Sequence, residues 1–160
     1  MIDPRTSLVA GVLATGVLTL VMTASQGLGW SRISLPYMLG TIFSPRRGRA
    51  MAIGSLTHAV LGLLLALFYF LVFEVWGRAG WERGAALGLL HGAFVLVVGM
   101  EILPAWHPRM ASRHHGPTPT RQLEPPGFLA LNYGWATPVV TLVAHLLYGA
   151  ILGAFARTVV

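Results

Sequence analysis

Long apolar stretches separated by short polar clusters are the feature that most limits how this chain can fold. Only 10% of its 160 residues are charged and 55% are hydrophobic, whereas a soluble domain carries about 25% charged residues. The stretches near residues 6–27, 50–76, 84–103 and 135–157 are each long enough to cross a bilayer as a helix. The sequence therefore predicts an all-α integral membrane protein with four transmembrane helices, a single membrane domain over residues 1–160.

Two of the predicted loops contain apolar segments that are too short to span a membrane. Leu35–Phe43 lies in loop one (about residues 28–49), and a second segment begins at Pro126 in loop three (about residues 104–133). We expect both to be short interfacial or re-entrant segments. Pro104 is expected to end the third span, because proline has no backbone N–H with which to continue the helical hydrogen bonds.

The second and fourth apolar stretches share a pattern. When His58 is placed on His145, both read His-x3-Gly-x3-small-x-Phe. We infer an internal repeat of two helical hairpins, which are parallel because each contains an even number of spans. The two copies cover about residues 5–76 and 84–157.

Three histidines lie inside the predicted spans, at His58, His91 and His145. His91 lies within Gly88-x3-Gly92, a spacing of small residues that favours close helix contact. The repeat puts His58 and His145 at similar depth, and His91 enters from the other side, so the three side chains could meet in one bundle. An ionisable residue inside a span is by default a functional hypothesis.

The sequence leaves three interpretations of these histidines open. They could be neutral side chains that hydrogen-bond to neighbouring helices. His58 and His145 could be axial ligands of a haem or of a pigment magnesium, with their glycines leaving room for the macrocycle. All three could line a transition-metal site or a proton pathway.

A second group of candidate ligands lies in and just before loop three, namely Glu101, His107, His114, His115 and Glu124. Imidazole and carboxylate suit zinc, iron or copper, but the spacing matches no established metal motif. An ordered polar cap or a docking loop for a partner is the alternative.

Several functions are disfavoured by what the chain contains. It has no cysteine, so disulfides, thiolate metal sites and a cysteine nucleophile are excluded. The net charge of +6 comes from arginines that flank apolar stretches, which indicates contact with lipid headgroups rather than nucleic acid. Asp3 is the only aspartate and no G-x-S-x-G occurs, so an enzyme is the less favoured interpretation.

The run from Met100 to Tyr133, with its HHGPTPTRQLEPPG stretch, and the following TPVVTLVAHLLYGAILGAF resemble a family of uncharacterised bacterial inner-membrane proteins. Members have about this length, four spans, a Pro-rich third loop and His-x3-Gly in their helices. The resemblance implies the fold and a multi-pass location in the bacterial inner (cytoplasmic) membrane. The family has no established activity, so the resemblance implies no catalytic residue.

Arginine placement predicts an orientation. Loops one and three hold seven of the eleven arginines, and the termini and loop two (residues 77–83) hold four. The positive-inside rule then places loops one and three in the cytoplasm.

These features favour a non-catalytic accessory or scaffold subunit in the lipid bilayer, packed against itself or a larger membrane complex. The alternative is a membrane protein that binds haem, a pigment or a metal through its intramembrane histidines. A small transporter or channel that acts as an oligomer is the third hypothesis, since repeats are common among transporters.

Overall fold

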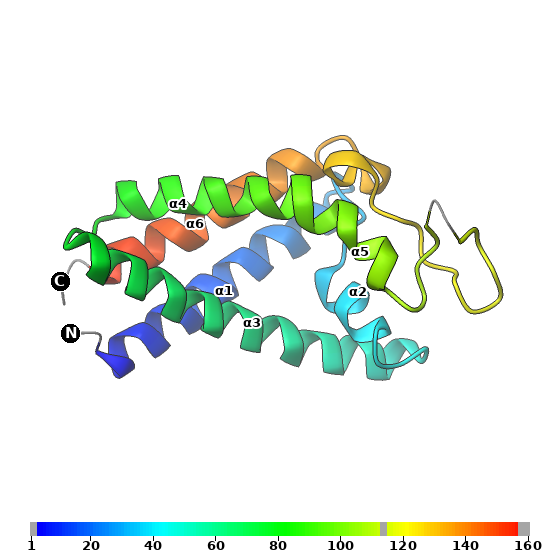
Figure 1. Cartoon of the computed structure of the whole chain (residues 1–160), viewed down its shortest axis with the longest axis horizontal. Coiled ribbons are helices and arrows are strands. Elements are labelled where there is room, and N and C mark those ends of the chain that lie inside the picture. The colour runs from blue at the N-terminus through cyan, green and yellow to red at the C-terminus, as the bar shows by residue number, and fades with distance from the viewer. Residues whose placement is uncertain (1–2, 113–114, 157–160) are drawn as a thin grey trace.

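The fold is helical throughout the part of the chain that the structure describes. This computed structural model describes residues 3–112 and 115–156, and apart from one isolated bridge between Met110 and Leu123 its regular elements are helices. In chain order they are α1 (Pro4–Gly27), α2 (Leu35–Thr41), α3 (Arg47–Trp76), α4 (Trp81–Phe94), the π-helix η1 (Val95–Gly99), α5 (Met100–Trp106), the 3₁₀ helix η2 (Phe128–Tyr133) and α6 (Thr137–Ala156) (Figure 1).

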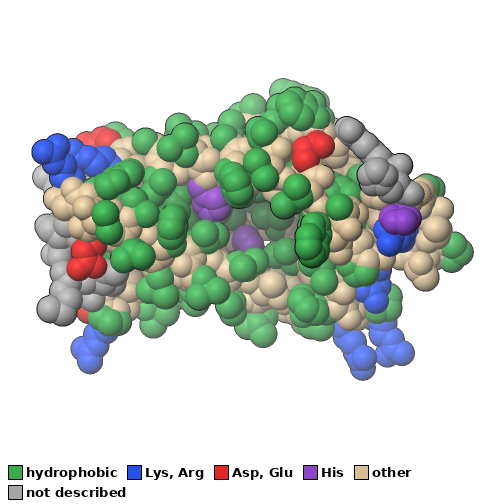
Figure 2. Space-filling model, in the orientation of Figure 1, with side chains coloured by type: hydrophobic (Ala, Val, Ile, Leu, Met, Phe, Trp, Pro, Cys, Tyr) green, Lys and Arg blue, Asp and Glu red, His purple; other side chains and the backbone are tan. Residues whose placement is uncertain are grey.

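Four helical stretches of the described chain are long and apolar enough to cross a membrane. They are Pro4–Gly27, Arg47–Trp76, Trp81–Trp106 and Thr137–Ala156, each with a mean hydropathy of 2.0 to 2.3. Figure 2 shows hydrophobic side chains over the middle of the molecule and arginine side chains near its two ends. The prediction of a four-span, multi-pass membrane protein is confirmed at this level.

Local sequence signals explain where several helices begin and end. The Asp3 carboxylate accepts the backbone N–H of Thr6 at 2.9 Å and so caps α1, whose first residue is Pro4. Gly77 ends α3 in the left-handed conformation, at φ +60°, which glycine adopts without a steric penalty. The apolar segment of loop one forms the short helix α2, and its interfacial or re-entrant placement stays a prediction.

The third span differs from the prediction, because Pro104 does not end it. The π-helical turn of η1 passes directly into α5, and the helix continues through Pro104 to Trp106. The proline lies in the last turn, where it removes one hydrogen bond, while the His107 N–H still bonds to the Leu103 carbonyl at 2.9 Å. A helix tolerates the loss of one bond near its end better than in its interior.

The helices pack in an incomplete ring. α6 is the most buried span and contacts α4, α1 and α3. α1 also packs against α3, and α2 packs on α3. Although a short turn joins them, α3 and α4 diverge and make almost no backbone contact (Figure 1), and the space-filling view shows a recess in this face (Figure 2), which we call the open side.

Glycines allow α4 and α6 to lie unusually close together. A methyl group built on Gly84 would lie 2.0 Å from the Gly149 carbonyl oxygen, and one on Gly149 would lie 2.1 Å from the Gly84 oxygen. One on Gly88 would lie 2.1 Å from the His145 oxygen. Gly88-x3-Gly92 is therefore a helix-contact motif, as its spacing predicts.

Loops one and three lie at the same end of the molecule, and the start of α1, the end of α6 and the α3–α4 turn lie at the other end (Figure 1). Which end faces the cytoplasm stays a prediction. The duplication also stays a prediction. The short element of loop three, η2, contacts α6 as α2 contacts α3, but Leu129 and Ala130 within it adopt left-handed backbone angles.

Candidate functional site

Two of the three intramembrane histidines meet inside the bundle. The rings of His91 on α4 and His145 on α6 are in edge-to-face contact, with centroids 4.7 Å apart. Tyr69 reaches across from α3, and its hydroxyl lies 3.2 Å from His91 Nδ1. Tyr148 on α6 packs edge-on against Tyr69, with centroids 5.5 Å apart. We call these four residues the His–Tyr cluster.

The glycines of α4 explain why His145 meets His91. A methyl group built on Gly88 would lie 2.1 Å from the His145 carbonyl oxygen, so only glycine lets the His145 backbone approach this closely, and one built on Gly92 would crowd His145 Cβ at 3.0 Å. His91 is the neighbour of Gly92 in sequence and therefore lies at the border of the same contact. His145 is only 5% exposed as a result.

Most polar atoms of the His–Tyr cluster have partners within the chain. The His145 ring donates from Nδ1 to the Thr141 carbonyl at 2.8 Å, since a carbonyl oxygen can only accept. The Tyr148 hydroxyl donates to the Gly62 carbonyl at 2.6 Å and so ties α6 to α3. The His145 bond stays within α6, whereas the Tyr69–His91 contact joins α3 to α4, so a role of all three histidines as hydrogen-bonding residues between helices stays a prediction.

The His91–His145 pair does not fit a haem held between two axial ligands. Each axial bond would be about 2 Å long, as metal–imidazole bonds are. With a metal between the two rings, the centroids would be separated by two such bonds plus the distance from each bonding nitrogen to the centre of its ring. That sum is more than the 4.7 Å that separates the ring centroids. The predicted axial pair was His58 and His145, and that assignment stays a prediction.

His58 lies in a groove of about 340 Å³ between α1 and α3. It is half-buried and makes no hydrogen bond or ring contact with the side chains that the structure describes. The groove also contains Thr15, which is only 8% exposed and whose hydroxyl has no hydrogen-bond partner among the described residues. We call this the α1–α3 groove.

At the loop end of the molecule, His107 joins loop three to loop one. It is 1% exposed, its Nε2 donates to the Met38 carbonyl at 3.0 Å, and its Nδ1 accepts the Arg109 backbone N–H at 3.1 Å. The Arg109 guanidinium donates to the Thr41 and Ile42 carbonyls at the end of α2. Burial and the neighbouring Arg109 charge lower the pKa of His107, and its bond to the Met38 carbonyl opposes them.

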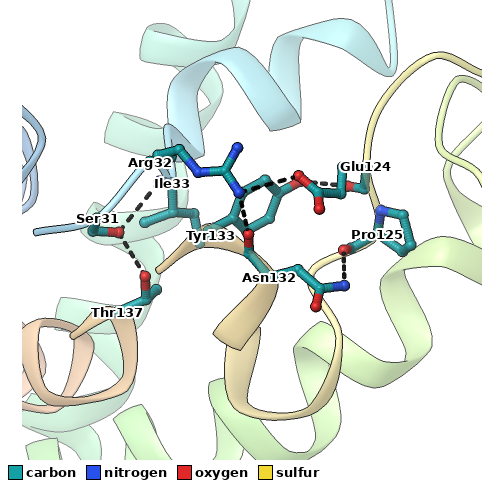
Figure 3. Close-up of polar contacts among 8 residues, drawn as sticks. All are labelled: Ser31, Arg32, Ile33, Glu124, Pro125, Asn132, Tyr133 and Thr137. Carbon is teal, nitrogen blue, oxygen red and sulfur yellow. Dashed lines mark hydrogen bonds and ion pairs between the residues drawn. The ribbon is translucent and has the colours of Figure 1, made fainter. Parts of the chain in front are cut away.

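A second set of contacts fastens loop three to loop one near η2 (Figure 3). Arg32 lies 3.4 Å from Glu124 and donates to the Asn132 carbonyl. Burial raises the pKa of Tyr133 to about 12, the Glu124 charge adds to this, and Arg32 opposes it. The Ser31 and Thr137 hydroxyls are 2.8 Å apart. These bonds support the interpretation of loop three as an ordered polar cap.

The predicted loop-three ligands are not gathered in the described part of the chain. Glu101 is exposed beside a recess that also contains Ser112 and Asn132. His115 is exposed, and both ring nitrogens of His107 are engaged. Within residues 3–112 and 115–156, no three histidine, aspartate or glutamate side chains lie close enough together to hold a metal ion. His114 lies outside the described residues, so the predicted set as a whole stays a prediction.

Sequence reasoning did not identify the two tyrosines of the His–Tyr cluster, although a signal was present. Tyr148 follows His145 by three residues, and Tyr69 follows His58 by eleven, or three helical turns. Each therefore shares a helix face with a histidine. A polar aromatic residue on the face of an intramembrane histidine is a sign of a buried network.

Comparison of the chain with protein-family models, with curated proteins and with solved structures found no match. The resemblance to a family of small inner-membrane proteins therefore stays a prediction. The part of it that the structure supports is the presence of four candidate membrane spans.

Proposed function

We propose that this protein is a non-catalytic accessory or scaffold subunit that assembles laterally in the membrane, with itself or with a larger complex. The observation that carries the proposal is the open side of the bundle, where α3 and α4 diverge. A further transmembrane helix seated between them would complete the ring of helices.

The chemistry of the open side supports a protein neighbour rather than lipid alone. Figure 2 shows histidine side chains in a recess of this face, and the Tyr69–His91 pair bridges α3 and α4 at membrane depth. Polar side chains at this depth nearly always face protein or water, because lipid offers them no partner. Helices in a bilayer associate through close packing and interhelical hydrogen bonds, and the open side offers both.

Site-specific photocrosslinking in native membranes tests this proposal. Phe94 is 61% exposed on α4 and lies one helical turn after His91. Around the helix axis, Gly88 lies on one side of His91 and faces α6, and Phe94 lies on the other side. A photoreactive residue at Phe94 should give a discrete protein adduct. The same residue at Leu13, which is 48% exposed on α1, is the matched lipid-facing control and should give little.

Native mass spectrometry in a mild detergent provides the second measurement. The proposal expects a defined homo-oligomer or a stoichiometric complex. A monomer, together with equal adduct yields at Phe94 and Leu13, would refute it. A visible absorption band that the purified protein retains and His145→Ala loses would instead support the cofactor-binding hypothesis.

A further inference from the structure

The turn between α2 and α3 carries a surface with the properties of an anion site at the edge of the membrane. It consists of Phe43, Arg46, Arg47 and Arg49, together with the neighbouring recess beside Arg109, and we call it the arginine corner. We propose that the arginine corner binds the headgroup of an anionic phospholipid. The proposal stands on uncompensated charge, on a rigid support and on the apolar surface beside the arginines.

The positive charge of the arginine corner is not compensated by the chain around it. The guanidinium groups of its three exposed arginines make no hydrogen bond or ion pair with the described residues. No aspartate or glutamate occurs in residues 4–73, and Glu124 of loop three pairs with Arg32 instead. Figure 2 shows arginine side chains projecting from the end of the molecule where α2 meets α3. The charge is therefore free to attract an anion from outside the chain.

Two glycines hold the turn in a fixed position. A methyl group built on Gly40 would overlap the Ala50 carbonyl, and one built on Gly54 would overlap the Pro36 carbonyl. Only glycine therefore lets α2 and the start of α3 lie in backbone contact. The two helices form a tight hairpin, which carries the arginines and Phe43. A site that is already in place loses less conformational entropy when a ligand binds.

Arg109 adds a fourth guanidinium group from loop three. Its Nη1 donates to the Thr41 and Ile42 carbonyls, at 3.0 Å for Ile42, and the remaining guanidinium N–H groups make no hydrogen bond with the described residues. Arg109 lines a recess of about 340 Å³ that also contains Pro45, the neighbour of Arg46, and none of the lining residues is acidic. Hydrogen bonds from guanidinium to phosphate are among the strong, charge-assisted ones.

Apolar side chains beside the arginines distinguish a lipid from a free anion. Phe43 is 60% exposed, and Met51 and Ile53 on the first turns of α3 are 38% and 37% exposed. α3 is a candidate membrane span that begins at Arg47, so the arginines lie where the apolar span begins. A lipid there presents its headgroup to the arginines and its acyl chains to the apolar side chains, whereas free phosphate gains only the first contact.

The net charge of the arginine corner also selects among lipids. A zwitterionic headgroup balances its phosphate with its own cation, so it gains little from a positively charged surface. An anionic headgroup has no such internal partner, and basic side chains near a membrane surface attract it. Phosphatidylglycerol and phosphatidylcholine therefore form a matched pair of probes, because the two lipids can carry the same acyl chains.

The test is equilibrium binding of fluorescent phosphatidylglycerol to the full chain in an uncharged detergent, with phosphatidylcholine of the same chains and label as the comparison. We expect the wild-type protein to bind phosphatidylglycerol about 10-fold more tightly. Replacing the three exposed arginines together, as Arg46→Gln, Arg47→Gln and Arg49→Gln, should reduce this preference to about 2-fold or less. The matched control replaces three exposed arginines at the other end of the molecule, Arg5→Gln, Arg78→Gln and Arg83→Gln, and should keep the wild-type preference.

Three outcomes of this test would overturn the proposal. They are equal affinities of the wild-type protein for the two lipids, a preference that the variant of the arginine corner retains, and an equal loss in the control variant. Inorganic phosphate should displace no more phosphatidylglycerol than chloride does at the same ionic strength. A larger effect of phosphate would show that the site selects a free anion and would also contradict the proposal.

Photocrosslinking of the wild-type protein gives a readout that needs no variant. The probe is a phosphatidylglycerol with a diazirine in its headgroup. Adducts at residues 36–53, suppressed by excess unlabelled phosphatidylglycerol, support the site. Adducts spread evenly over both ends of the molecule, or insensitive to the competitor, argue against it. A negative result leaves the subunit proposal standing, because that proposal rests on the open side between α3 and α4.

Discussion

Replacing Gly84 by alanine tests the close contact between α4 and α6. The new methyl group would lie 2.0 Å from the Gly149 carbonyl oxygen and 3.0 Å from Gly153 Cα. Carbon and oxygen do not approach this closely, so the two helices must move apart by about 1 Å. The obstacle is backbone in a helix, which cannot rotate away as a flexible side chain can.

The expected loss of stability is near the top of the usual range for overpacking. Added methyl groups in a packed interior cost about 1–3 kcal/mol. The displacement at Gly84 would also loosen the neighbouring contact of Gly88 with His145. There, a methyl group built on Gly88 would lie 2.1 Å from the His145 carbonyl oxygen. We therefore expect a loss of about 3 kcal/mol for Gly84→Ala.

The matched control is Gly16→Ala on α1, where the new methyl group meets nothing within 4 Å. In water, alanine stabilises a helix interior over glycine by up to about 1 kcal/mol. In a bilayer the gain is smaller, because the segment stays helical when tertiary contacts are lost. We expect a change of less than about 0.5 kcal/mol.

The assay is a reversible titration of the protein in bicelles with sodium dodecyl sulfate, followed by tryptophan fluorescence. Gly84→Ala should unfold at a clearly lower detergent fraction, and Gly16→Ala at that of the wild type. If Gly84→Ala and Gly16→Ala unfold at the same detergent fraction, α4 and α6 are not in backbone contact and the reasoning fails.

Two further predictions concern single polar groups. Thr141→Val should stabilise the protein by about 1 kcal/mol in the same titration, because it removes a buried hydroxyl without a partner; a destabilised variant would show that the hydroxyl is bonded. The pKa of His107 is lowered by burial, so its stabilising contribution is present above its ordinary pKa of about 6.5 and is lost as the pH falls below that value. Hydrogen exchange at the Ala111 and Leu123 amides, corrected for intrinsic rates, should therefore show more opening at about pH 5.5 than at about pH 7.5. Equal opening at the two pH values would contradict this.

The membrane spans could be predicted closely because hydropathy and length are properties of consecutive residues. The first span was expected from Thr6 and begins at Pro4, and the second was expected from Ala50 and begins at Arg47. The extra turn of α3 consists of arginine and glycine, and long cationic side chains at the end of a span can extend a helix beyond its apolar part. A span boundary predicted from a run of apolar residues therefore stops before such charged residues.

What the sequence did not predict depends on contacts between distant segments. The third span contains a π-helical turn at Val95–Gly99, which no residue type in that run marks, and it continues through Pro104 to Trp106. The divergence of α3 from α4 was also not predicted, since a short loop ordinarily joins antiparallel neighbours. Here α6 takes the place beside α4, because glycines on both helices permit a closer approach than α3 can make.

The two aligned histidines, His58 and His145, show how one helix motif acquires two environments. Each is followed four residues later by a glycine that contacts the preceding helix of its own half. In the second half, that helix presents glycines, so the backbones close over His145 and leave it 5% exposed. In the first half, it presents Thr15 against Gly62, and the threonine side chain holds the helices apart beside His58. Glycines on the facing helix thus let the backbones bury His145, whereas Thr15 on the facing helix leaves His58 half-buried on the α1–α3 groove.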